Sequence, residues 1–71
     1  MELIEIGEVF RHRRQFLNLL QTDIEELSGV NTKTIQQIES GKGNPSFETL
    51  QKIAAVLGMQ ISVQVKDIDN G

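Results

Sequence analysis

The sequence predicts an all-α bundle of four short helices, followed by one C-terminal β-strand that pairs across a dimer. Two observations predict the bundle. Apolar residues recur at three- and four-residue spacing in four segments, and glycine, asparagine or proline separates these segments. A third observation predicts the strand, because the apolar period after Gly58 falls from about 3.6 residues to 2.

The 71 residues are enough for one domain, predicted over residues 1–66 with a short polar tail over 67–71. A chain of this length buries only about 60% of the surface that its unfolded state exposes, so a partner subunit would add stability. The absence of cysteine excludes disulfides, thiolate metal sites and a cysteine nucleophile. No apolar run approaches about 18 residues and the N-terminus is acidic, so we expect a cytoplasmic protein without a membrane span.

The first helix is predicted over residues 3–17, where apolar side chains recur along one face. Asn18 then suits the left-handed position at which many helices end. The C-terminal half of this helix carries the basic run 11–14. The helix dipole alone accounts for this placement, and a phosphate-facing patch that includes Arg11 is the alternative. Arg14 shares the apolar face, where a buried guanidinium needs a carboxylate partner.

The next two helices, over residues 21–28 and 32–40, are joined by a tight turn. Gly29 is the informative residue, because glycine adopts the positive φ of such a turn at little steric cost. Asn31 follows as the N-cap of the second of these helices. Two helices joined in this way form the helix-turn-helix pattern.

The outer face of the helix over residues 32–40 is the candidate binding surface. Ile35 and Ile38 face inward. The residues left outside are Thr32, Lys33, Gln36 and Gln37. Glutamine pairs with adenine and lysine with guanine in the DNA major groove, so these side chains are candidate base readers. An ordinary solvated helix surface is the other interpretation.

A loop over residues 41–45 leads to the fourth helix, which Ser46 caps and whose apolar residues from Phe47 to Leu57 are predicted to face inward. Lys42 stands close to this helix N-terminus, an arrangement that favours phosphate. A plain connecting loop is the alternative. The fourth helix itself is predicted to be core scaffold.

Residues 60–66 alternate polar and apolar, with Ile61, Val63 and Val65 on one side. A lone strand cannot satisfy its own backbone hydrogen bonds. Because the chain has no second predicted strand, the simplest partner is the same segment of another copy, paired antiparallel about a two-fold axis. The sequence therefore predicts a homodimer.

The net charge of −3 argues at first against a nucleic-acid partner. However, the acidic residues cluster apart from Arg11, Lys33 and Lys42, so one face can be basic on an acidic protein. Enzyme signatures are missing. The single histidine, His12, lies inside the basic run, and no glycine pattern matches a phosphate-binding loop. We expect no catalytic activity, metal or cofactor.

With these residues placed, the chain resembles the Cro/CI-type helix-turn-helix family of bacterial and phage regulators, also called the xenobiotic-response-element family. The resemblance covers about residues 6–57. It rests on Arg14, Gln21, Ile24, Gly29-Val30, Ile35, Ile38-Glu39, Gly41-Lys42, Asn44-Pro45-Ser46 and the helix that ends at Leu57-Gly58. It implies a lambda-repressor-like bundle that binds double-stranded DNA.

The resemblance also implies residue roles. Arg14 and Glu39 would form a buried ion pair between the first and third helices, while Gln21, Lys42 and Asn44 would bind phosphates. Thr32, Lys33, Gln36 and Gln37 would read bases. The chain departs from the family at two positions, with Glu25 in place of a small residue and Leu20 in place of a capping Thr or Ser. Either the two motif helices splay, or Glu25 leans outward.

The C-terminal strand is similar to that of HipB-type antitoxins and small stand-alone regulators like them. This likeness implies a homodimeric repressor that binds a palindromic operator, with a HipA-type toxin as a possible partner. The competing hypothesis is a protein-interaction module that keeps the fold and binds DNA weakly or not at all.

Overall fold

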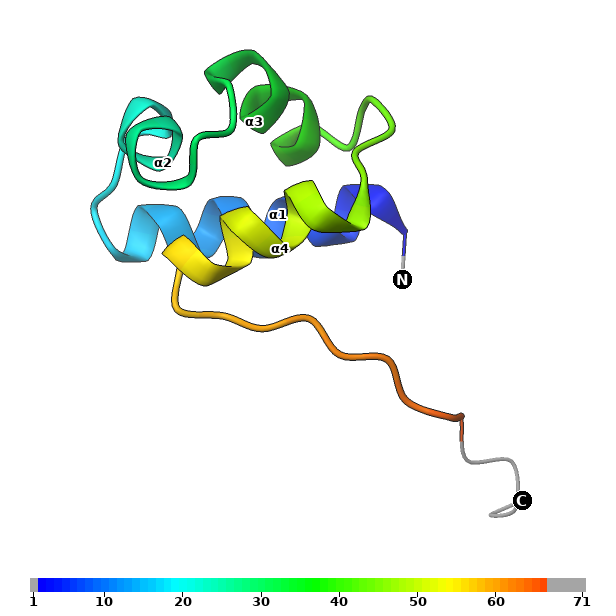
Figure 1. Ribbon diagram of the computed structural model, residues 1–71. Helices are drawn as coiled ribbons and strands as arrows, with labels where there is room; N and C mark the ends of the chain where they lie inside the picture. Colours follow the sequence, from blue (N-terminus) through cyan, green and yellow to red (C-terminus); the bar gives the residue numbers. More distant parts are fainter. Residues whose placement is uncertain (1, 67–71) are drawn as a thin grey trace.

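The computed structural model describes residues 2–66 and confirms the predicted helical bundle. This part of the chain holds four helices, namely α1 (Leu3–Phe16), α2 (Gln21–Ser28), α3 (Thr32–Glu39) and α4 (Phe47–Val56). α2 and α3 pack over a layer formed by α1 and α4 (Figure 1). This arrangement leaves one long side of α3 on the outside of the molecule.

The core fills the space between the two layers. Its buried apolar residues come from all four helices and from the segments that follow α2 and α4: Phe10, Ile24, Val30, Ile35, Ile38, Ile53, Ala54 and Leu57. Leu27, which shares the helical spacing of Ile24, is exposed, and the prediction that Phe47 faces inward is wrong. Both residues lie at helix ends, Leu27 near the last residue of α2 and Phe47 at the first residue of α4.

The turn between α2 and α3 has the predicted geometry. Gly29 adopts a φ of +79° and ends α2. The Ser28 hydroxyl accepts a hydrogen bond from the Val30 N–H at 3.0 Å, and the Asn31 side chain accepts one from the Lys33 N–H at 2.7 Å. Side chains on both sides of the glycine therefore fix the angle at which α3 leaves the turn.

α1 and α3 approach each other closely at Gly7, which is buried. A Cβ atom added at this position would lie 2.0 Å from the carbonyl oxygen of Ile38. Only glycine permits this contact between the two helices, because any side chain would push α3 away from α1.

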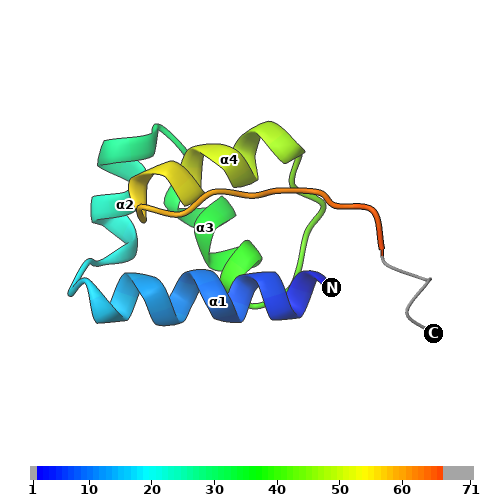
Figure 2. The ribbon, with the colours of Figure 1, turned by 90° about the horizontal axis from the view of Figure 1, so that it is seen from below.

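The prediction of a β-strand over residues 60–66 is wrong for the single chain. No strand occurs anywhere in residues 2–66, because this part of the chain offers no second extended segment to complete a hydrogen-bonded ladder. The segment instead runs along the outer side of the layer formed by α1 and α4 and then leaves the bundle (Figures 1 and 2). Ile61 packs against the core, whereas Val63 and Val65 are 89% and 97% exposed.

The predicted polar tail over residues 67–71 lies outside the described residues. Across residues 2–66, no helix has both the length and the apolar character to cross a membrane.

Candidate nucleic-acid interface

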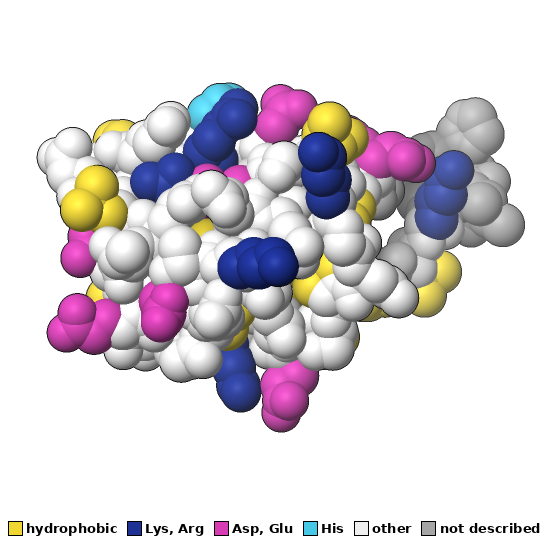
Figure 3. All heavy atoms as spheres, turned by 90° about the horizontal axis from the view of Figure 1, so that it is seen from above, with side chains coloured by type: hydrophobic (Ala, Val, Ile, Leu, Met, Phe, Trp, Pro, Cys, Tyr) yellow, Lys and Arg dark blue, Asp and Glu magenta, His cyan; other side chains and the backbone are white. Residues whose placement is uncertain are grey.

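The outer side of α3 is a polar surface with few charges. Lys33, Gln36 and Gln37 are exposed and Thr32 is half-buried, whereas Ile35 and Ile38 on the opposite side are buried. Seen from the α2–α3 side, most of the surface is uncharged (Figure 3). Lys and Arg side chains lie at its centre, along its upper edge and at its lower edge, and most Asp and Glu side chains lie along its margins. The surface can therefore offer hydrogen bonds without strong repulsion of an anion.

A bidentate ion pair holds α3 against α1. The Arg14 Nε donates to Glu39 Oε2 at 2.7 Å, and its Nη2 donates to Glu39 Oε1 at 2.9 Å. Only 12% of the Arg14 side chain and 7% of the Glu39 side chain are exposed. Hydrogen bonding to Glu39 raises the pKa of the Arg14 guanidinium, so the guanidinium remains charged.

Two further hydrogen bonds extend this ion pair. Gln21 Nε2 at the start of α2 donates to Glu39 Oε1 at 3.0 Å. Arg14 Nη1 donates to the Leu19 carbonyl at 2.9 Å. The buried network thus joins α1, the segment before α2, α2 and the C-terminal end of α3, and it fixes α3 relative to the first two helices.

A shallow hollow lies on the surface next to the Arg14–Glu39 network, on the α2 side of α3. Arg11, Gln21, Gln36 and Ser40 contribute to its wall, together with Arg14 and Glu39. The structure therefore brings together two predicted phosphate ligands, Arg11 and Gln21, and the predicted base reader Gln36. Since Arg11 is half-buried, its side chain is partly positioned by the surrounding protein.

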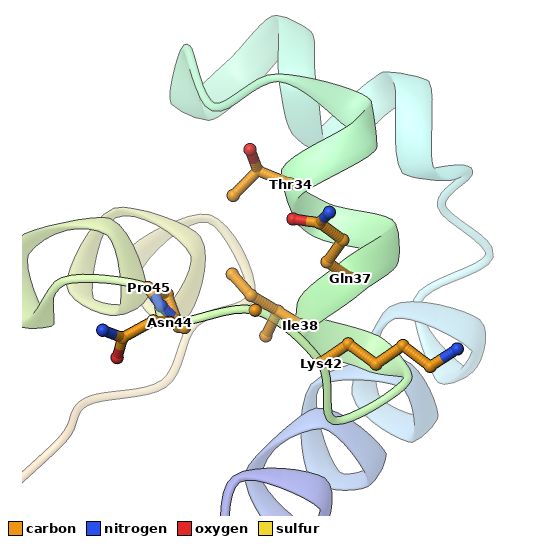
Figure 4. Close-up of a pocket in the computed structure, with 7 residues that line it drawn as sticks. Thr34, Gln37, Ile38, Lys42, Asn44 and Pro45 are labelled. Carbon is orange, nitrogen blue, oxygen red and sulfur yellow. The ribbon is translucent and has the colours of Figure 1, made fainter.

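A second hollow lies on the loop side of α3. Gln37 lines it together with Thr34, Lys42, Asn44 and Pro45 (Figure 4). Lys42 and Asn44 leave the loop in opposite directions in this view, so the two predicted phosphate ligands do not converge on one point. The predicted site residues thus divide into two groups that flank α3, with Lys33 exposed on the helix itself.

The basic run of α1 serves two different surfaces. Arg13 Nε donates to the Leu57 carbonyl at 3.0 Å, and its guanidinium lies 5.4 Å from the centre of the Phe16 ring. Arg13 therefore connects α1 to the C-terminal end of α4, while Arg11 faces the hollow beside Gln21. The sequence pattern does not predict this role of Arg13, because the carbonyl that it binds is 44 residues away along the sequence.

The two departures from the family pattern have local explanations. Glu25 leans outward, where its Oε1 accepts a hydrogen bond from the Thr32 N–H at 2.8 Å and another from the Thr32 hydroxyl. These bonds lower the pKa of Glu25, the hydroxyl contributing most. At Leu20, the Asp23 carboxylate accepts the backbone N–H at 2.7 Å and supplies part of the cap that the leucine side chain cannot.

This geometry defines a helix-turn-helix protein in which the outer side of the second motif helix, α3, is exposed, and the comparisons with known proteins agree. A family model described as helix-turn-helix matches residues 10–64. The chain belongs to this family, the Cro/CI or xenobiotic-response-element type of helix-turn-helix protein.

Three relatives have similar sequences. The chain is 46% identical over 50 residues to an uncharacterized HTH-type transcriptional regulator of Haemophilus influenzae, covering 70% of this chain and 51% of the relative. It is 39% identical over 51 residues to another such regulator of Methanocaldococcus jannaschii, covering 72% and 77%. It is 27% identical over 59 residues to the ImmF control region 10 kDa protein of Bacillus phage phi105, covering 83% and 66%. The chain thus spans about half the length of the Haemophilus relative.

Proposed function

We propose that this protein is a sequence-specific regulator of transcription that binds double-stranded DNA through α3. The observation that carries the proposal is the exposed row of Lys33, Gln36 and Gln37 on a helix whose far end is fixed by the buried Arg14–Glu39 pair. A rigid polar helix of this kind fits the major groove. The names of the Haemophilus and Methanocaldococcus relatives support the same class of function.

The proposal gives the flanking groups a positioning role. Arg11 and Gln21 on one side of α3, and Lys42 and Asn44 on the other, would bind phosphates and set the register of the helix. Gln21 gives one amide hydrogen to Glu39, which leaves the second hydrogen for a phosphate oxygen.

The proposed regulator is a homodimeric repressor that binds a palindromic operator. Two recognition helices about 34–36 Å apart would enter successive major grooves. The exposed Val63 and Val65, together with Ile61, are the proposed dimer contacts. Ile61 also lines an apolar groove between α1 and α4 that includes Val9 and Leu50, so a second copy would cover surface that is otherwise in water.

A narrower form of the proposal is an antitoxin that binds a HipA-type toxin. Its test is co-purification of the chain with the product of the neighbouring gene. Failure to co-purify would remove the antitoxin role and leave DNA binding as the function.

The decisive experiment is footprinting of the purified protein on DNA fragments from upstream of its own gene, at low and at moderate salt. Protection of a two-fold symmetric site at both salt concentrations is the expected result. Binding that is uniform along the DNA and disappears at moderate salt would contradict sequence specificity. With no binding at all, the net charge of −3 would favour the alternative, a protein-interaction module with the same fold.

A further inference from the structure

The contact between Glu25 and Thr32 joins the two helices of the motif at the start of the recognition helix. A single carboxylate oxygen of Glu25 accepts both the backbone N–H and the hydroxyl of Thr32. Thr32 is the first residue of α3, and its side chain also borders a hollow that includes Gln21 and Thr22. The contact therefore lies within the proposed DNA-binding surface.

The hydrogen bond determines what the Thr32 hydroxyl can offer to a base. A hydroxyl has one hydrogen to donate and two lone pairs to accept with. An ionised carboxylate only accepts, so the hydrogen of Thr32 must point toward Glu25. The oxygen then presents only lone pairs to any other partner, and threonine loses the ambiguity that normally lets it contact either a donor or an acceptor.

The major groove offers few groups that suit such an acceptor. Adenine and cytosine carry exocyclic amines that donate, whereas guanine and thymine present carbonyl oxygens that repel a lone pair. The negative charge of Glu25, which is exposed beside Thr32, adds to the repulsion of those carbonyls.

We propose that Glu25 is a specificity-determining residue that holds Thr32 as an acceptor and so selects adenine or cytosine at one position of each operator half-site. This inference rests on the proposed DNA-binding function. Glu25 acts through Thr32 and is a positioning residue, while Thr32 contacts the base.

The test is measurement of the relative affinities of operator fragments that carry each of the four bases at every half-site position. The proteins compared are the wild type, Glu25→Ala, Thr32→Val and Glu26→Ala. Alanine at position 25 has no acceptor, so the Thr32 hydroxyl is free to donate its hydrogen. Glu26→Ala is the matched control, because it removes the same charge from the neighbouring exposed residue.

At one half-site position, the wild type should favour adenine or cytosine over guanine and thymine by about tenfold. Glu25→Ala and Thr32→Val should each abolish this preference, while Glu26→Ala should keep it. If Glu25→Ala and Glu26→Ala instead raise affinity equally for all four bases, Glu25 acts only through its charge and the inference is wrong. An unchanged preference in Glu25→Ala would also overturn it.

Failure of the proposed function would look different, since the wild type would then show no base preference at any position. Circular dichroism of each variant checks that the helices are retained. Thr32→Val keeps the Glu25 charge and the backbone N–H bond to Glu25, so it removes only the hydroxyl. Its result therefore tests the role of the hydroxyl even if loss of the Glu25 charge displaces α3.

Discussion

Arg14 on α1 and Glu39 at the end of α3 form two N–H···O bonds, of 2.7 and 2.9 Å, across the interior of the bundle. The pair stabilises one position of α3, because both groups lose their bonds if the helix shifts. Glu39 also accepts a hydrogen bond from Gln21, a proposed phosphate ligand. The same carboxylate therefore holds both the buried Arg14 and a residue at the edge of the proposed DNA-binding surface.

Glu39→Leu alone should therefore lower the free energy of unfolding by about 3–5 kcal/mol, because it leaves the Arg14 charge buried without its partner. Replacing both residues, as in Arg14→Met with Glu39→Leu, should recover most of this loss, since no buried charge remains. Urea unfolding followed by circular dichroism measures both variants. A double variant that is as unstable as the single one would show that packing, and not the unpaired charge, accounts for the loss.

Gly7→Ala should destabilise the protein even though alanine favours helix formation. The added Cβ would lie 2.0 Å from the Ile38 carbonyl oxygen, so α1 and α3 would have to separate. We expect a loss of about 1–3 kcal/mol in thermal or urea unfolding. Glu8→Ala, at the adjacent exposed position of α1, is the control and should be nearly neutral. Equal stabilities for the two variants would mean that the helices separate at little cost.

Gly7 also illustrates the limit of the sequence analysis. The four helices could be predicted because apolar residues recur at helical spacing. The turn between α2 and α3 could be predicted because Gly29 and Asn31 have local conformational preferences that mark the end of one helix and the start of the next. The close approach at Gly7 and the bond from Arg13 to Leu57 depend on how distant segments pack, which periodicity does not encode. The alternation over residues 60–66 indicates an extended chain, but a strand also requires a partner.

Gln37→Ala should reduce affinity for the preferred operator by about 10- to 100-fold while leaving non-specific DNA binding unchanged, because a base-reading amide contributes roughly 1–3 kcal/mol of discrimination. Gln51→Ala removes the same amide from an exposed position on α4 and should have no effect. Competition binding against specific and random DNA measures both. If Gln37→Ala weakens both kinds of DNA equally, Gln37 does not read a base.

Val63→Asp should shift the protein from dimer to monomer in sedimentation equilibrium. Val63 is 89% exposed in the single chain, and a carboxylate buried there by a second copy would lose its hydration. Gln64→Asp introduces the same charge at the next exposed position and should leave the dimer intact. A dimer that persists in Val63→Asp would place the interface on another surface.

The contact between Glu25 and Thr32 should make stability depend on pH. The two hydrogen bonds lower the pKa of Glu25 in the folded chain below its ordinary value of 4.5. A carboxyl with a lowered pKa contributes stability above its unfolded pKa and loses it as pH falls through the folded value. The stability advantage of the wild type over Glu25→Gln should therefore be constant near neutral pH and shrink once pH drops below 4.5.

Thr32→Val should keep part of this pH dependence, because the backbone N–H still donates to Glu25. Urea unfolding of the three proteins between neutral and acidic pH measures the difference, and a difference that grows toward acid would mean that the carboxylate is not stabilised by Thr32.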